Sequence, residues 1–311
     1  MSKVPMRDGY GKALLELCEK NPKVMVLDAD VAKSTRTVWI RDQYPEKFLD
    51  MGISEQDMVG TAAGLALSGM VPFTSTYCVF LAGRAWDQIR TTVCYNRLNV
   101  KLGGAHAGIS VGPDGATHQS LEDIALMRAL PDMVVLNPCD FNQTKNATIA
   151  AAKYEGPVYL RFGRPSVPNF TPENEEFVIG KAQVMNEGKD VTIVACGHLV
   201  WEALQAAELL EAEGICAEVI NMATIKPLDE ETLLVSASKT KAVVVAEEHN
   251  MAGGLGEAVA GVFARTLPTP VEFINGADRF GQTGTPSALM AAYGLDAQHI
   301  AEAAKKAISR K

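Results

Sequence analysis

The sequence lacks the features of secreted and membrane proteins. None of its six cysteines lies in a Cys-x-x-Cys pair, so we expect neither a disulfide framework nor a zinc site. No segment reaches the ~18 consecutive apolar residues of a transmembrane helix, and residues 1–12 contain no apolar signal-peptide core. These absences predict a cytoplasmic protein with reduced thiols, no membrane association and no metal site built from this chain alone.

Positive charge is also scarce. The 311 residues carry 37 acidic and 29 basic side chains, for a net charge of −8, and the basic ones are scattered. Neither a nucleic acid nor an anionic membrane is therefore an expected partner. With 47% hydrophobic and 21% charged residues, the composition is that of a globular protein of about two domains, at roughly 100–200 residues each.

Apolar, strand-like runs alternate with segments of helical periodicity. In the first half, strands are expected at 23–30, 71–76 and 99–106, and helices over 9–20, 55–69, 82–95 and 141–153. The same alternation returns in the last third of the chain. Strands that alternate with helices form βαβ units and a mostly parallel sheet.

A proline-rich, acidic segment separates the two series. Residues 164–177 contain three prolines and a cluster of glutamates, the composition of an exposed linker. We therefore predict an α/β fold of two domains, each a mostly parallel sheet flanked by helices, over residues 1–178 and 179–311. Ligands of such sheets bind at the carboxyl ends of the strands, so polar residues there are the first candidates for a site.

The stretch MGISEQDM, residues 51–58, places Glu55 where a turn is expected to enter a helix. One interpretation is structural: Ser54 caps the helix, Asp57 completes a short capping box, and Glu55 favours the helix dipole. The other is chemical: a carboxyl group buried against an apolar wall retains a proton for acid–base work. The local sequence leaves both interpretations open.

Residues 112–119, GPDGATHQ, combine glycines with Asp114 and His118, and His106 lies just upstream. Two histidines and an aspartate can ligate a metal, but their spacing matches no known zinc pattern. Imidazole exchanges protons near neutral pH, so a loop that presents these side chains to a sugar hydroxyl is the favoured interpretation. A purely structural turn is the alternative.

Aromatic and basic side chains follow two other strands. TSTYCVF contains Tyr77 and Phe80, whose rings can stack on a heteroaromatic ligand or simply fill the core. LRFGRP contains Arg161 and Arg164, whose planar guanidinium groups suit phosphate or stay solvated at a sheet edge. The glycine-rich segment 253–258 lacks the complete dinucleotide pattern, so a nicotinamide-dependent dehydrogenase is not favoured.

In their order along the chain, these segments resemble the C-terminal half of the transketolases, a family of thiamine-diphosphate enzymes. The segments are GISEQDMVGTAAGLAL, PFTSTYCVF, GPDGATHQ and LRFGRP, continued by TIKPLD and AEEHNMAGGLGEA. The resemblance implies a pyrimidine-binding domain followed by a transketolase C-terminal domain. That family binds the diphosphate and Mg²⁺ through a Gly-Asp-Gly motif, which this sequence lacks. The resemblance therefore implies that the metal ligands lie on a separate N-terminal transketolase subunit. That subunit would be the partner of this chain in an α2β2 assembly.

The resemblance also implies roles for the residues that face the thiamine diphosphate. Glu55 matches the glutamate whose proton on an aminopyrimidine nitrogen promotes the tautomer that activates the thiazolium. Phe80 matches the stacking aromatic residue, and Tyr77 is a second wall. Asp30 matches an acid near the cofactor.

One of these positions departs from the family pattern. The third aromatic residue of some members falls at Gly83. The resemblance therefore implies a roomier pocket, or compensation by Arg84 or Trp86.

The remaining candidates face the substrate. His106, His118 and Asp114 match family residues that contact the sugar substrate, with Asp114 facing a hydroxyl. His118 is also the second catalytic candidate, besides Glu55. Arginine and serine side chains match groups that hold the phosphate of the sugar. The substrate-facing set is Arg7, Ser34, His106, Asp114, His118 and Arg164.

The leading interpretation is a transketolase subunit that moves a two-carbon ketol unit between sugar phosphates, with pentose phosphates as the default substrates. Within the superfamily, the alternatives are the β subunit of a 2-oxo-acid dehydrogenase and half of a deoxyxylulose-phosphate synthase. In a different class, the chain would be a catalytically silent partner that stabilises its companion. A branched or sulfonated sugar would use the same ketol chemistry.

Overall fold

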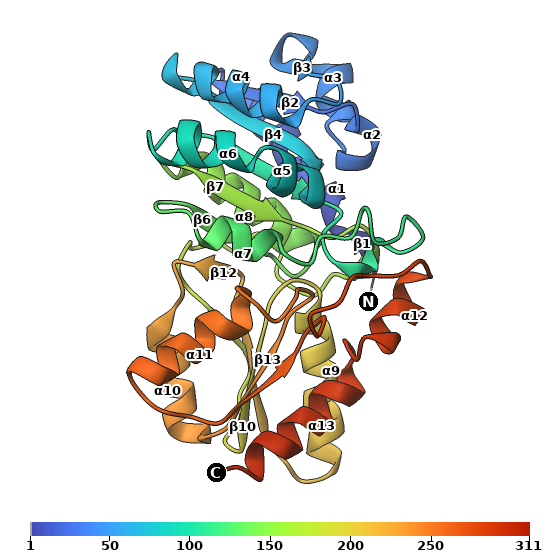
Figure 1. Cartoon of the computed structure of the whole chain (residues 1–311), viewed down its shortest axis with the longest axis vertical. Helices are drawn as coiled ribbons and strands as arrows, with labels where there is room; N and C mark the ends of the chain where they lie inside the picture. Colours follow the sequence, from blue (N-terminus) through green and yellow to red (C-terminus); the bar gives the residue numbers. More distant parts are fainter. Residues whose placement is uncertain (1) are drawn as a thin grey trace.

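The chain forms two α/β units stacked along its long axis (Figure 1). The computed structural model describes residues 2–311. No helix in this part of the chain combines the length and apolarity needed to cross a bilayer. Each unit is built on one sheet with helices on both faces, so the predicted α/β class with mostly parallel sheets is confirmed.

The first unit contains a seven-stranded sheet in the order β12-β6-β7-β5-β4-β2-β3. All neighbouring pairs are parallel except β12 with β6. The strands are β2 (Val24–Asp28), β3 (Phe48–Asp50), β4 (Val71–Tyr77), β5 (Lys101–Ala105), β6 (Val134–Leu136), β7 (Val158–Arg161) and β12 (Thr224–Lys226). The central strands are buried on both faces, as their nearly unbroken apolar runs require.

The helices that cover this sheet include most of those expected from periodicity. They are α1 (Met6–Lys20), α2 (Ala32–Thr35), α3 (Val38–Gln43), α4 (Glu55–Leu67), α5 (Cys78–Arg84), α6 (Trp86–Gln88), α7 (Asp123–Arg128) and α8 (Phe141–Lys153). The single helix expected over 82–95 is instead broken into α5, α6 and a π-helical turn, Ile89–Cys94. Gly9 lets α1 approach α8, because a Cβ there would lie 2.3 Å from the Phe141 carbonyl oxygen.

The second unit contains a five-stranded sheet in the order β14-β13-β10-β11-β9, in which only the edge strand β9 is antiparallel. The strands are β9 (Gln183–Asn186), β10 (Val191–Ala195), β11 (Ala217–Asn221), β13 (Val243–Ala246) and β14 (Val271–Ile274). The helices are α9 (Leu199–Ala212), α10 (Glu230–Thr240), α11 (Leu255–Arg265), α12 (Pro286–Ala292) and α13 (Ala297–Ile308). The antiparallel strand β12 leaves this unit and extends the first sheet, so the two units share one strand.

The expected exposed linker is only partly exposed. Its first residues form β8 (Ser166–Pro168), which pairs antiparallel with β1 (Lys3–Pro5) near the N-terminus. The Asp140 carboxylate then accepts hydrogen bonds from the backbone amides of Phe170 and Thr171, at 2.8 and 2.7 Å. The prediction is therefore wrong for this first part, because pairing of distant segments satisfies its backbone, whereas residues 172–176 are exposed.

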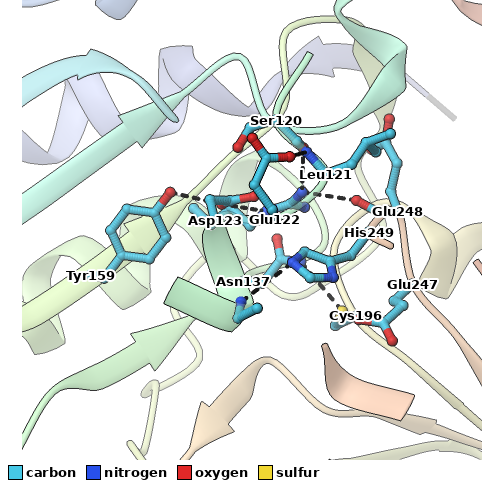
Figure 2. Close-up of polar contacts among 12 residues, drawn as sticks. Ser120, Leu121, Glu122, Asp123, Asn137, Tyr159, Cys196, Glu247, Glu248 and His249 are labelled. Atoms are coloured by element: carbon cyan, nitrogen blue, oxygen red, sulfur yellow. Dashed lines mark hydrogen bonds and ion pairs between the residues drawn. The ribbon is translucent and has the colours of Figure 1, made fainter. Parts of the chain in front are cut away.

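A buried polar network joins the two units (Figure 2). Asp123, the first residue of α7, accepts hydrogen bonds from the Tyr159 hydroxyl at 2.7 Å and from Nε of Arg161 at 2.8 Å. The Arg161 guanidinium also donates to the carbonyl of Glu248 in the second unit, at 2.8 Å. Although burial opposes ionisation, Arg161 holds the pKa of Asp123 below its usual value. The pair therefore stays charged at the boundary between the units.

We predict that Arg161→Leu lowers the free energy of unfolding by about 3–5 kcal/mol, because it leaves the Asp123 carboxylate buried without a counter-charge. Urea unfolding at pH 7 measures this loss. The matched control is Arg265→Leu, which removes an exposed pair with Glu230 and is expected to cost about 1 kcal/mol or less. Equal losses in the two variants would contradict the assignment.

Candidate active site

Glu55 is the first residue of α4, and its side chain is 3% exposed. Both carboxylate oxygens face Nη1 of Arg84, at 3.2 and 3.1 Å. The hydroxyl of Ser54 donates to the carbonyl of Met51 at 2.6 Å, and no side chain caps the helix. The interpretation of this stretch as a capping box is therefore wrong.

The environment of Glu55 also differs from the apolar wall that the sequence suggested. The guanidinium of Arg84 lies 4.0 Å from the centre of the Phe80 ring while it pairs with Glu55. A buried carboxylate needs such a counter-charge, and the ring adds a cation–π contact. Because Arg84 itself is half-exposed, the pair forms the outer edge of the site.

Tyr77 ends β4, Phe80 lies in α5, and their rings form an aromatic wall with the two histidines. The Tyr77 and Phe80 rings are stacked with centroids 6.0 Å apart, and His106 stacks on Tyr77 with centroids 4.2 Å apart. His118 meets the Phe80 ring edge-on at 5.2 Å. Residues from the ends of β4 and β5 and from the loop at 112–119 therefore meet at one place, at the carboxyl ends of the strands.

His106 has the most unusual backbone in this cluster. Its φ angle of 57° lies in the left-handed region, which is rare for a residue with a Cβ and marks a position held by its surroundings. Its ring is buried, and Nδ1 has no hydrogen-bond partner. Burial, and then the nearby Arg7 and Arg164, lower the pKa of His106 to about 3. The imidazole is therefore neutral and has a free polar atom to offer a ligand.

Basic side chains gather beside the histidines. Nη1 of Arg7 donates to the Ser34 carbonyl at 3.2 Å, and the Ser34 hydroxyl is 3.0 Å from the Tyr77 hydroxyl. Nη1 of Arg164 donates to Asp114 at 3.1 Å. Burial and then Arg36 lower the pKa of Arg7, so positive charge is crowded here, an arrangement that suits an anionic group.

Two candidates lie apart from this cluster. Asp30 is exposed on the turn after β2, and its amide donates to Asp50 at 3.2 Å. No hydrogen bond or ion pair of the described residues joins Asp30 to the other candidates. Arg161 is buried in its pair with Asp123, so only Arg164 of the LRFGRP arginines is accessible to a ligand.

Asp28 is a residue whose role the sequence did not reveal, although it ends an apolar strand. Its carboxylate accepts hydrogen bonds from the Thr35 and Thr37 hydroxyls and from the Val31 amide, each at 2.7 Å. These bonds hold the turn that carries Ser34. Burial raises the pKa of Asp28 to about 6, despite the hydroxyl donors that favour its charged form.

The site fits one half of thiamine diphosphate. A buried carboxylate beside stacked aromatic rings suits a planar base with a ring nitrogen, and the buried Nε of Arg7 and Nδ1 of His106 lack partners. By contrast, the described residues contain no group of three or more side chains able to ligate a metal. The arrangement therefore suits the aminopyrimidine and a polar substrate.

We predict that Asp28→Asn removes a pH dependence of stability. Because the folded pKa of Asp28 is raised to about 6, the native protein binds a proton more tightly than the unfolded chain between about pH 4 and pH 6. The free energy of unfolding therefore falls as pH rises through this window, by on the order of 2–3 kcal/mol. Because Asn does not ionise, the variant lacks this contribution. Urea unfolding from pH 4 to pH 7.5 measures the difference between variant and parent. The control is Asp30→Asn, which changes an exposed acid. The prediction is contradicted if the difference in unfolding free energy between Asp28→Asn and the parent varies with pH no more than it does for this control.

Comparisons with known proteins agree on the family. The transketolase pyrimidine-binding domain model matches residues 2–169, and the transketolase C-terminal domain model matches residues 180–300. A transketolase C-terminal section of Methanocaldococcus jannaschii is 48% identical over 96% of this chain and 94% of its own. A 6-deoxy-6-sulfo-D-fructose transketolase subunit of a Clostridium species is 42% identical, over 98% of this chain and 95% of that protein.

A solved structure agrees at the level of the whole chain. It is described as a split-gene transketolase in the form of an inactive β4 tetramer. It superposes with a TM-score of 0.91 at 48% identity and covers 99% of both chains. With matching domains, close relatives and a shared fold over its length, this chain belongs to the transketolase family.

Proposed function

We propose that this chain is the catalytic-glutamate subunit of a two-subunit, thiamine-diphosphate-dependent transketolase that moves a two-carbon ketol unit between sugar phosphates. The observation that carries the proposal is the buried Glu55 carboxylate, which pairs with the Arg84 guanidinium that lies over the Phe80 ring, in a chain whose described residues contain no metal-ligating cluster. One part of the cofactor site is present, and the part that binds diphosphate and Mg²⁺ is expected on another subunit. We place the assembly in the cytoplasm.

Three similar proteins support the division between two subunits. One is described as a C-terminal section, another as a subunit, and the third as a split-gene product whose β chains alone form an inactive tetramer. We propose the same arrangement here: an N-terminal transketolase subunit binds beside the aromatic wall in an α2β2 assembly. The alternative of a silent partner is disfavoured because Glu55 and both histidines are retained in one cluster.

Thiamine diphosphate, when bound, supplies the carbon nucleophile and the electron sink for ketol transfer. With the cofactor bound, the Glu55 carboxylate would hold and exchange the proton of the aminopyrimidine ring nitrogen, and Phe80 and Tyr77 would orient that ring. Glu55 is fixed for this task because it starts a regular helix and is buried. We propose that Asp30 also lies near the bound cofactor, although it is on an exposed turn of this chain.

The remaining residues bind the substrate. His118 exchanges a proton with a sugar hydroxyl, the neutral His106 forms a hydrogen bond to a hydroxyl, and Asp114 accepts a hydrogen bond from another hydroxyl. Arg164 and Arg7, with Ser34, hold the anionic end. These arginines would accept either a phosphate or a sulfonate, because both are tetrahedral oxyanions, and one relative is named as a subunit of a transketolase for a sulfonated fructose. Sugar phosphates are the proposed substrates, and a sulfonated sugar is the second candidate.

The proposal predicts that Glu55→Gln lowers ketol transfer by the reconstituted complex by about 10²-fold or more, because an amide cannot exchange a proton with the ring nitrogen of the cofactor. The measurement is product formation from a panel of ketose and aldose phosphates, including a sulfonated ketose. Asp57→Asn is the matched control, since Asp57 is an exposed acid in the same helical turn, and it should retain nearly full activity. A Glu55→Gln complex as active as the parent would favour the silent-partner alternative instead.

A further inference from the structure

We propose that the second unit positions the substrate-facing loop, and that Gln119 is the positioning residue through which it does so. The substrate loop is defined here as residues 112–119, which carry Asp114 and His118. The bracing loop is defined as residues 276–285, which lead from β14 to α12. This inference rests on the proposed function for the role of the substrate loop, but its structural basis is independent of that function.

Gln119 is buried at the end of the substrate loop, with 4% of its surface exposed. Its side-chain amide donates hydrogen bonds to two carbonyls of the same region, those of Ile109 at 3.1 Å and Gly112 at 3.3 Å. It also donates to the carbonyl of Gln282 in the bracing loop, at 2.9 Å. One side chain therefore closes the substrate loop on itself and ties it to the second unit.

The two loops approach too closely for side chains to separate them. A Cβ on Gly281 would lie 1.7 Å from Oε1 of Gln119, and a Cβ on Gly115 would lie 2.6 Å from Oγ1 of Thr283. Gly115 is also left-handed, with φ of 76°, whereas Gly281 is not. In Figure 1 the segment before α12 runs along the boundary between the two units, next to the first unit. The bracing loop is therefore a supporting surface for the substrate loop.

The substrate loop depends on this support because its own bonds are few. Within it, the backbone forms only the bonds from Gly115 to Gly112 at 3.2 Å and from His118 to Gly115 at 3.0 Å. Asp114 is exposed and His118 half-buried, while Gly112, Gly115 and Gln119 are buried. The buried residues contact the bracing loop or α12. The side chains of Asp114 and His118 lie between these buried positions in the loop. Displacement of the bracing loop would therefore move the side chains of Asp114 and His118.

The decisive variant is Gly281→Ala, which places a methyl group against Gln119 without changing any residue of the proposed site. Gly281 has no left-handed φ, so alanine fits its backbone and only this contact is disturbed. The second variant, Gln119→Glu, keeps the side-chain shape but removes the donor to three carbonyls. Gly261→Ala is the control, because a Cβ there, in helix α11, lies no closer than 3.5 Å to another atom, at the flexible end of Arg265.

In the reconstituted complex, we expect both variants to lower kcat/KM for the sugar substrates by about fivefold or more, mainly through KM, because the reacting groups are displaced. Binding of thiamine diphosphate, which depends on the Glu55 side of the site, should be unchanged by calorimetry. Gly261→Ala should match the parent. Parent-like KM values in Gly281→Ala and Gln119→Glu would overturn the proposal, as would a loss of cofactor affinity equal to the loss for substrate.

A second readout needs no activity. Amide hydrogen exchange of the peptide covering the substrate loop, measured on the full chain alone, should be faster in both variants than in the parent and Gly261→Ala. Unchanged exchange would overturn the proposal even if activity falls. If the parent complex transfers no ketol unit, the proposed function fails, while the exchange experiment still decides whether Gln119 and the bracing loop hold the substrate loop.

Discussion

The structure of the site depends on one ion pair, between the buried Glu55 and the half-exposed Arg84. Removing a carboxylate from water costs several kcal/mol unless a counter-charge is present, and Arg84 supplies that charge at 3.1 Å. The N-terminus of α4 adds a favourable dipole at the same point. Because Arg84 also lies over the Phe80 ring, the pair fixes α4 relative to α5. The acid and the aromatic wall are thereby held in one geometry.

The second unit makes buried contacts beside this site. The Arg161–Asp123 pair reaches across the boundary to the Glu248 carbonyl, and Gln119 reaches across to the Gln282 carbonyl. Both contacts are buried. The first fixes the end of β7 and the start of α7, and the second fixes the end of the substrate loop. The two units therefore act as one scaffold, in which the strand ends carry the chemistry and the second unit limits their movement.

Much of this was predictable from local pattern, and the errors have a common cause. Unbroken apolar runs gave the central strands, and helical periodicity gave α1, α4 and α8. The apolar wall around Glu55 and the first part of the exposed linker were wrong, because each depends on a partner distant in sequence: Arg84 for Glu55, and β1 and Asp140 for the linker. Periodicity describes one element at a time, whereas charge pairs and sheet edges join distant segments.

The central claim is that this chain completes a cofactor site whose charged end is bound by another chain. Calorimetric titration of thiamine diphosphate with Mg²⁺, into this chain alone, into the N-terminal subunit alone and into their mixture, tests it most directly. We predict weak binding to this chain, because its described residues offer no cluster of metal ligands, and tight Mg²⁺-dependent binding to the mixture. Tight, Mg²⁺-dependent binding to this chain alone would contradict the account.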